Sequence, residues 1–316
     1  MSANRLLGKV RLIAADSDSP QSSGLAGGLD ASERRRRAFL VTLNFVLAQV
    51  DSARRLDGDD LVTTLVFIAV TQANVGHVDE DPALFGLWGQ LEEPVPDELR
   101  RPVSGYATAL ALGLPRETVR RKINALVERG LLVNAPGGGV YSPAAILAHP
   151  GMMSYSHDAV AAARAFFLRL HALGVVTSQQ VEEAEARPAL PRMTARAVTS
   201  FVMTALEPIQ RLAGGELTTG LVLAAIACAN AELHGPVTAL ALAERLGLAR
   251  ETTRRHVGRL TTQGLAAATS RGVLTPPAVL EGPKVQGAYE RICGRRDTLV
   301  ERLTLAGILS RAAPAA

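Results

Sequence analysis

Aromatic residues and cysteines are scarce in this chain of 316 residues. Phe, Trp and Tyr make up only 4% of it, so a core must consist mainly of Leu, Val, Ile and Ala, a composition that favours helices. The two cysteines, Cys228 and Cys293, are far apart and form no Cys-x-x-Cys pair. This spacing argues against a disulfide framework and a zinc site, and it fits a reducing cytoplasm.

Long apolar runs and catalytic motifs are missing as well. The apolar stretches Leu61–Val70 and Leu221–Ala229 are shorter than the roughly 20 residues that a membrane span needs, so we expect buried helices and no membrane partner. The first residues contain no apolar run typical of a secretory signal, which favours the cytoplasm and the bacterial nucleoid. Because phosphate-binding, hydrolase and metalloprotease motifs are absent, we expect no enzyme, no cofactor and no metal site.

An internal duplication dominates what is present. Residues 102–133 align without a gap with residues 236–267, and roughly half of the positions are identical, far above chance. The likeness continues upstream, where Phe45 matches Phe201 and Asn74 matches Asn230. The first copy carries an extra stretch around 77–101. One structural unit is therefore present twice.

Both copies predict the same order of elements: a long helix, an apolar helix, a helix-turn-helix, a short hairpin and a closing helix. The sequence thus predicts a mainly α fold with two winged helix-turn-helix units in tandem, each with flanking helices and a β-hairpin wing. Residues rich in Ser, Gly and Asp form an expected mobile tail, and a segment with Pro-containing turns forms an expected linker. The predicted boundaries are 1–30 for the tail, 31–176 for the first unit (helix-turn-helix 102–133, wing 131–142), 177–191 for the linker, and 192–316 for the second unit (helix-turn-helix 236–267, wing 265–275).

The second helix of each helix-turn-helix is rich in arginine. In the first copy Val119, Ile123 and Leu126 have the spacing of a buried helix face, which leaves the arginines towards solvent. An exposed helix fits the major groove of DNA, where Arg can pair with guanine and Glu can accept a hydrogen bond from cytosine. These properties indicate a helix that reads bases.

The Arg-Glu-Thr-Val-Arg-Arg string at 116–121 resembles the recognition helix of the cyclic-AMP-receptor type of winged helix. That resemblance is confined to the helix-turn-helix, and no cyclic-nucleotide-binding β-roll precedes it. The wider order of elements is similar to the MarR family, in which the terminal helices form the dimer interface, so the chain resembles a MarR-like dimer fused into one polypeptide. The resemblance implies that bases are read by Arg116, Glu117 and Arg121, and in the second copy by Arg250, Glu251 and Arg255.

Other polar residues near these helices are expected to contact the DNA backbone, because hydroxyls, amides and further cations hold phosphates and fix the register. They are Thr118, Arg120, Lys122, Asn124 and Gly138 in the first copy, and Thr252, Arg254, His256 and Arg271 in the second. The second copy departs from the first: Thr253 replaces Val119, and Gly258 lies inside the helix at a cost of about 1 kcal/mol relative to Ala. We expect it to bind more weakly or to serve mainly as a partner for the first copy.

The sequence therefore favours a transcriptional regulator that binds double-stranded DNA and reads two related half-sites. Two alternatives stay open: a plasmid-type replication initiator that binds origin repeats, and a winged-helix subunit with an architectural or protein-interaction role. RNA polymerase or another transcription factor is a further candidate partner. The operator, activation or repression, a small-molecule effector, dimerisation of the fused chain and DNA binding by the second copy are left open.

Overall fold

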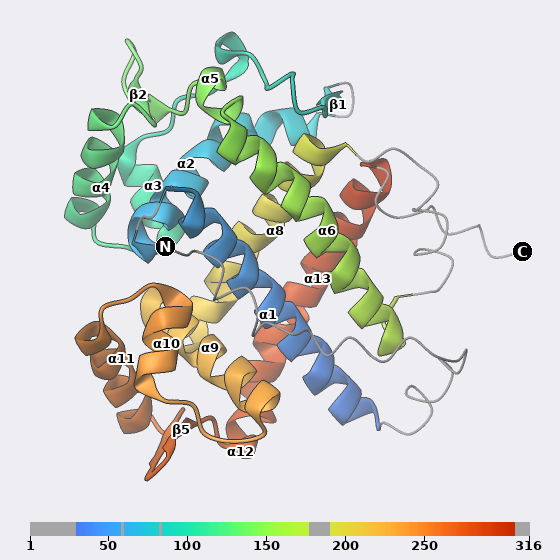
Figure 1. Ribbon diagram of the computed structural model, residues 1–316, viewed down its shortest axis with the longest axis vertical. Coiled ribbons are helices and arrows are strands. Elements are labelled where there is room, and N and C mark those ends of the chain that lie inside the picture. Colours follow the sequence, from blue (N-terminus) through green and yellow to red (C-terminus); the bar gives the residue numbers. More distant parts are fainter. Residues whose placement is uncertain (1–29, 58–59, 82–83, 177–189, 307–316) are drawn as a thin grey trace, which may run out of the picture.

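The computed structural model describes residues 30–57, 60–81, 84–176 and 190–306. The expected mobile tail, except for its last residue, and most of the expected linker lie outside the described residues. The described part is mainly helical, which confirms the mainly α class that the sequence predicts (Figure 1).

The same order of elements occurs in both halves of the chain. The first half contains α1 (Ala31–Asp57), α2 (Leu61–Glu80), β1 (Phe85–Trp88), a 3-10 turn (Asp97–Leu99), α3 (Gly105–Leu112), α4 (Arg116–Glu128), β2 (Val133–Asn134), β3 (Val140–Tyr141), α5 (Ala144–Leu147) and α6 (Pro150–Ala172). The second half contains α8 (Pro191–Leu212), α9 (Leu217–Leu233), α10 (Ala239–Leu246), α11 (Arg250–Thr262), β4 (Ala267–Thr269), β5 (Gly272–Leu274), α12 (Pro277–Leu280) and α13 (Pro283–Leu305).

Side-chain caps begin several of these helices. The backbone N–H of Glu33 donates to Asp30 Oδ1 at 2.7 Å, as the spacing of these two residues predicts. Ser104 and Thr238 occupy equivalent N-cap positions of α3 and α10, and each hydroxyl accepts from the backbone N–H three residues later. The starts of the repeated helices are thus encoded locally.

Helix α2 is longer than its sequence predicts. The apolar pattern indicates an end near Asn74, but the helix continues to Glu80. Its extra turns are covered by the additional stretch of the first half, since Val75 and Val78 pack on Val95 in a small apolar cluster. This contact between distant segments stabilises helix beyond the local signal.

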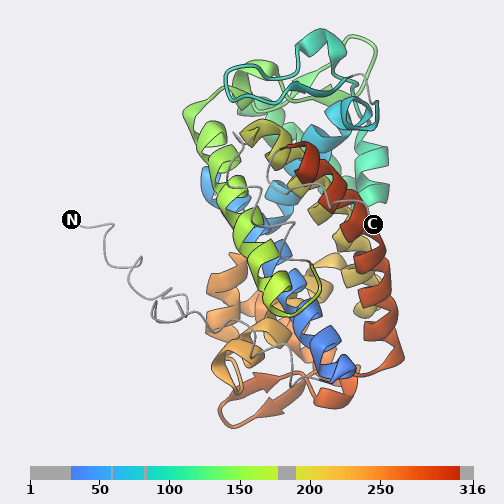
Figure 2. The same ribbon diagram turned by 90° about the vertical axis from the view of Figure 1, so that its right-hand side faces the viewer.

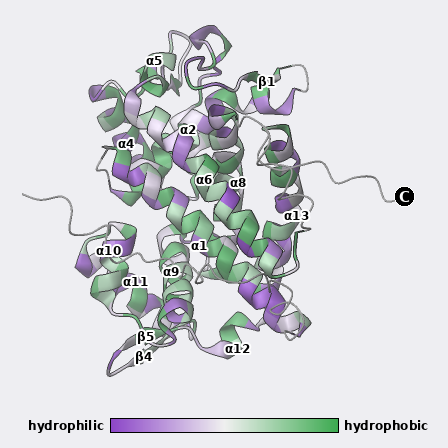
Figure 3. Cartoon of the chain, turned by 45° about the vertical axis from the view of Figure 1, so that its right-hand side comes forward, coloured by the Kyte–Doolittle hydropathy of each residue, from purple (hydrophilic) through white to green (hydrophobic). Residues whose placement is uncertain are grey.

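The two halves share one apolar core. Helix α1 packs along α6 and crosses α9, while α8 packs along α13 and also against α6 and α2. Phe45, Phe166 and Phe201 meet where the halves join, with 4.3 Å between the stacked rings of the first two. The helices at the centre of the molecule are largely hydrophobic (Figure 3).

By length and composition, α2 is the one helix of the described chain that is apolar enough to cross a membrane. Helices α8 and α9 meet that test only together, as a pair bent by 91°. In α2, however, 67% of the apolar window is buried inside the molecule, and a core helix has the same composition.

Candidate nucleic-acid interface

The turn before each arginine-rich helix has the same geometry in both halves. Gly113 ends α3 with φ of 58°, and Gly247 ends α10 with φ of 61°, a left-handed conformation that glycine adopts without strain. The next residue then bonds back into the helix: the N–H of Leu114 donates to Ala109 O, and that of Leu248 to Ala243 O, both at 3.0 Å. The turn fixes how α4 leaves α3 and how α11 leaves α10.

Burial on one face orients α4. Val119, Ile123 and Leu126 are buried, as their spacing predicts. The opposite face is exposed, and on α11 the equivalent face is exposed as well. The predicted contact residues that are exposed on these two helices are Arg116, Glu117, Arg120, Arg121 and Asn124 on α4, and Arg250, Glu251, Arg254 and Arg255 on α11. Thr118 and Thr252 are half-buried, and Gly138 and Arg271 are exposed in the turns of the two hairpins.

Charged groups on the exposed face of α4 hold one another in place. The guanidinium of Arg116 lies 4.0 Å from the centre of the Tyr106 ring, a cation–π contact. Arg120 donates to both carboxylate oxygens of Glu117, at 2.8 and 2.6 Å, and this lowers the pKa of Glu117. The pair with Arg120 therefore orients the carboxylate of Glu117 on this exposed face.

Lys122 lies apart from this exposed face. Its ammonium group is 2.7 Å from Asp60 Oδ2, and Asp60 also caps the start of α2. Burial opposes the charge of Asp60, but hydrogen bonds from Lys122 and Thr63 outweigh it and lower the pKa of Asp60. The lysine thus joins α4 to α2, and its phosphate contact stays a prediction.

The prediction of a phosphate contact by His256 is wrong. Its side chain is buried, and its Nδ1 lies 2.8 Å from the hydroxyl of Thr219 on α9. Burial lowers the pKa of His256 against the opposite effect of nearby Glu216, because it disfavours the charged ring. The reason is that His256 occupies the face of α11 that packs inward together with Thr253 and Leu260.

Each hairpin is fastened to the second helix of its half by an equivalent asparagine. Asn74 donates to Val140 O at 3.2 Å and accepts from the N–H of Ser142 at 3.0 Å. Asn230 donates to Val273 O at 3.0 Å and accepts from the N–H of Thr275 at 2.8 Å. The match between the two asparagines in the sequence therefore reflects a shared structural role.

The strands of both hairpins are antiparallel. Val133 pairs with Tyr141, and Ala267 pairs with Leu274. The segments before α3 and α10 add a bridge at equivalent places, Val103 to Val140 and Val237 to Val273. Each hairpin is thereby held against the helices that precede it in the chain.

Helices α4 and α11 lie on one side of the molecule, with the two hairpins at its opposite ends (Figure 1). Helices α6 and α13 face the viewer after the molecule is turned (Figure 2). The two arginine-rich helices thus lie on the same side of the described molecule.

Reciprocal contacts between the halves fix the two turns. A Cβ on Gly113 would collide with the amide of Gln210 from α8, and a Cβ on Gly247 would lie 2.6 Å from the guanidinium carbon of Arg54 from α1. Arg54 and Gln210 occupy matching positions in the register that aligns Phe45 with Phe201. The first helix of each half therefore touches the turn of the other half.

Comparisons with models of protein families, with curated proteins and with solved structures found no match. The candidate interface therefore depends on this chain's own geometry. In the described segments no group of three or more His, Cys, Asp or Glu side chains could hold a metal ion.

Sequence reasoning missed Arg54 and Gln210. Their contacts join parts of the chain that are far apart in sequence, and neither residue stands in a motif of its own. The repeat offered one signal, since both precede a matched residue pair, Arg55 and Arg211.

Proposed function

We propose that this chain is a sequence-specific regulator of transcription that binds double-stranded DNA with two winged helix-turn-helix units in a single polypeptide. The observation that carries the proposal is the pair of exposed, arginine-rich helices, α4 and α11, on the same side of one shared core. Each follows a turn of the same geometry and precedes a fastened hairpin.

The chemistry of the exposed faces suits the major groove. Arg121 and Arg255 occupy the same place in the two helices, and a guanidinium there can donate two hydrogen bonds to guanine O6 and N7. Arg116 is already oriented by Tyr106, which reduces the entropy lost when it binds a base or a phosphate. The hairpin turns at Gly138 and Arg271 are exposed where they can approach the adjacent backbone.

Two fused units imply a two-part site. If the halves bind as a pseudo-dimer, the half-sites lie about one helical turn, roughly 34–36 Å, apart. Because the two arginine-rich faces differ in their neighbours, with a Glu117–Arg120 pair on α4, the preferred site is an imperfect repeat.

The experiment is selection from a random duplex library by the purified full-length chain, followed by titration of the selected site with salt. We expect a two-part motif and an affinity that falls with a log–log salt slope of several units. Replacing Arg121 by Ala should cost about 1–3 kcal/mol and relax base choice at one position. The matched control is Arg291→Ala, which removes an exposed arginine from α13.

Each outcome separates one model from another. An equal loss on every sequence with Arg121→Ala makes Arg121 a phosphate contact and removes it from the base-reading set. Natural copies of the selected site that occur only in tandem beside a replication origin replace the regulator with a replication initiator. No binding to any duplex at low salt refutes the proposal and leaves a protein-interaction role.

A further inference from the structure

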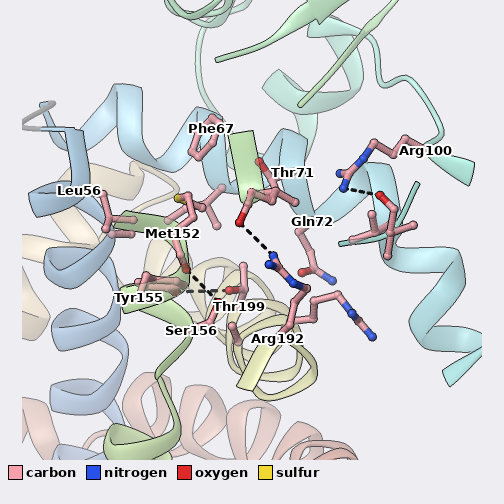
Figure 4. A pocket seen from close by; sticks show the side chains of 17 residues that line it. Leu56, Phe67, Thr71, Gln72, Arg100, Met152, Tyr155, Ser156, Arg192 and Thr199 are labelled. Atoms are coloured by element: carbon pink, nitrogen blue, oxygen red, sulfur yellow. Dashed lines mark hydrogen bonds between the residues drawn. The ribbon is translucent and has the colours of Figure 1, made fainter. Parts of the chain in front are cut away.

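A cavity lies where the two halves meet, between the end of α1, the middle of α2, and the starts of α6 and α8 (Figure 4). The space open to the centres of water molecules is about 90 Å³. Because one water needs about 10–15 Å³ by this measure, the cavity holds several waters or a small organic molecule. Its walls are largely apolar and include Leu56, Phe67, Val75, Met152 and Tyr155.

Three arginines, Arg100, Arg192 and Arg196, line the same cavity. Arg196 forms an ion pair with Asp79 at 2.8 Å, and Arg100 lies 3.2 Å from Asp97. Two of the three positive charges are therefore matched by carboxylates.

Arg192 is the unmatched cation. It is 5% exposed and donates to main-chain carbonyls only, those of Gln90 at 3.0 Å, Leu147 at 3.1 Å, and Leu91. It forms no ion pair with a carboxylate of the described chain. Burial, then repulsion from Arg196 and Arg100, lowers the pKa of Arg192 to about 10 despite an opposite effect of the exposed Glu92.

Two donors at the cavity lack an acceptor. Nη1 of Arg100, a residue only 5% exposed, and the hydroxyl of Thr71 are buried and make no hydrogen bond with the residues that the structure describes. Buried donors are nearly always paired, so unpaired ones beside a cavity indicate that a water molecule or a ligand in the cavity accepts from them.

We propose that this cavity binds a small organic monoanion, a carboxylic acid with an apolar body. Its carboxylate lies at Arg192 and Arg100, because planar guanidinium groups bind carboxylates with two hydrogen bonds. A single negative charge balances the one cation that Asp79 and Asp97 leave unmatched. The apolar body packs against Phe67 and Met152, as in most small-molecule sites.

The matching place of the repeat holds no cavity of comparable size among the described residues. In the register that aligns Phe45 with Phe201, Arg36 is the counterpart of Arg192, but Arg36 is paired with Glu33 at 2.7 Å. The space there offers only about 10 Å³ and is closed by Phe39, whose ring meets that of Tyr289 edge to face. The proposal is independent of DNA binding.

The test is a titration of the full-length chain with small acids in the absence of DNA. Binding is monitored by the fluorescence of Trp88, the only tryptophan of the chain. The carbonyl of Trp88 accepts from Arg196 Nη1 at 2.9 Å, so Trp88 contacts a residue that lines the cavity. We expect saturable binding of phenylacetate, binding of the neutral phenylacetamide weaker by about tenfold or more, and no saturation by acetate, which lacks the apolar body. Equal affinity for the acid and the amide overturns the assignment of the anion to the arginines.

Two variants test the position of the ligand. Arg192→Met should weaken phenylacetate binding by about tenfold or more, whereas the matched Arg36→Met should leave it unchanged. Ala195→Leu fills the cavity and should abolish binding even if the arginine variant fails to fold. Wild-type affinity in Ala195→Leu, or no saturable signal with phenylacetate, hexanoate or cyclohexanecarboxylate on the wild-type chain, overturns the proposal.

Discussion

Replacing Asn74 by Ala tests how the hairpin of the first half is held. The side chain of Asn74 is fully buried and joins α2 to three backbone groups, those of Arg101, Val140 and Ser142. Alanine removes these hydrogen bonds without adding volume.

The magnitude follows from what each group loses. The carbonyl of Val140 still accepts from the N–H of Val103 at 3.0 Å, so it stays paired. Ser142 is 0% exposed, and its N–H loses Asn74 Oδ1 as its acceptor, which alone costs about 1–3 kcal/mol. Together with the lost bond to Arg101 O, we expect the free energy of unfolding to fall by about 2–3 kcal/mol.

The assay is equilibrium unfolding in urea, with hydrogen exchange of the hairpin amides as a local readout. Asn230→Ala should behave alike, because Asn230 makes the equivalent bonds to Val273 and Thr275. Asn124→Ala, on the exposed face of α4, is the control and should stay within about 0.5 kcal/mol. If Asn74→Ala is as stable as this control, the hairpin does not depend on the asparagine and the reasoning fails.

Three further outcomes are expected. Because burial lowers the pKa of His256, the folded state binds fewer protons than the unfolded one, and stability falls as pH drops below about 6.5. Urea unfolding of His256→Gln at several pH values should show a smaller loss of stability, and an unchanged slope of unfolding free energy against pH contradicts this. Gly220→Ala places a Cβ into the carbonyl of Ile209 and should destabilise the fold by about 1–3 kcal/mol. Gly258→Ala lies in open space on α11 and should stabilise the fold by about 0.5–1 kcal/mol. The reverse order of the two variants in thermal unfolding refutes the packing argument. Burial raises the pKa of Cys228 to about 12, so iodoacetamide should spare it in the native chain, and mass spectrometry that finds it alkylated contradicts its burial.

Local features of the fold could be predicted from the sequence because local interactions determine them. The cap at Asp30 and the buried spacing of Val119, Ile123 and Leu126 each depend on a few neighbouring residues. The buried spacing recurs in the second half, and the duplication made it visible twice. The mainly helical class followed from the composition and these signals.

What depends on distant contacts could not be predicted. Arg192 and Arg196 stand four residues apart at the start of α8, a pattern typical of a solvated helix face. Both are buried because carbonyls from the additional stretch around Leu91, about a hundred residues earlier, accept from their guanidinium groups. His256 was misplaced for a related reason, since its acceptor, Thr219, lies on another helix.

The shared core also changes how mutations act. In a dimer of identical chains every substitution appears twice, at both copies of the interface, and must be tolerated in both places. Here α1 contacts the second half and α8 contacts the first, and each half has its own stretch of sequence. A substitution in one half is therefore met by residues of the other half that can change independently. The sequences of the two halves can therefore diverge independently. This accounts for a cavity at one place of the shared core and a nearly filled space at the matching place. It also accounts for Lys122 facing Asp60 where His256 faces Thr219.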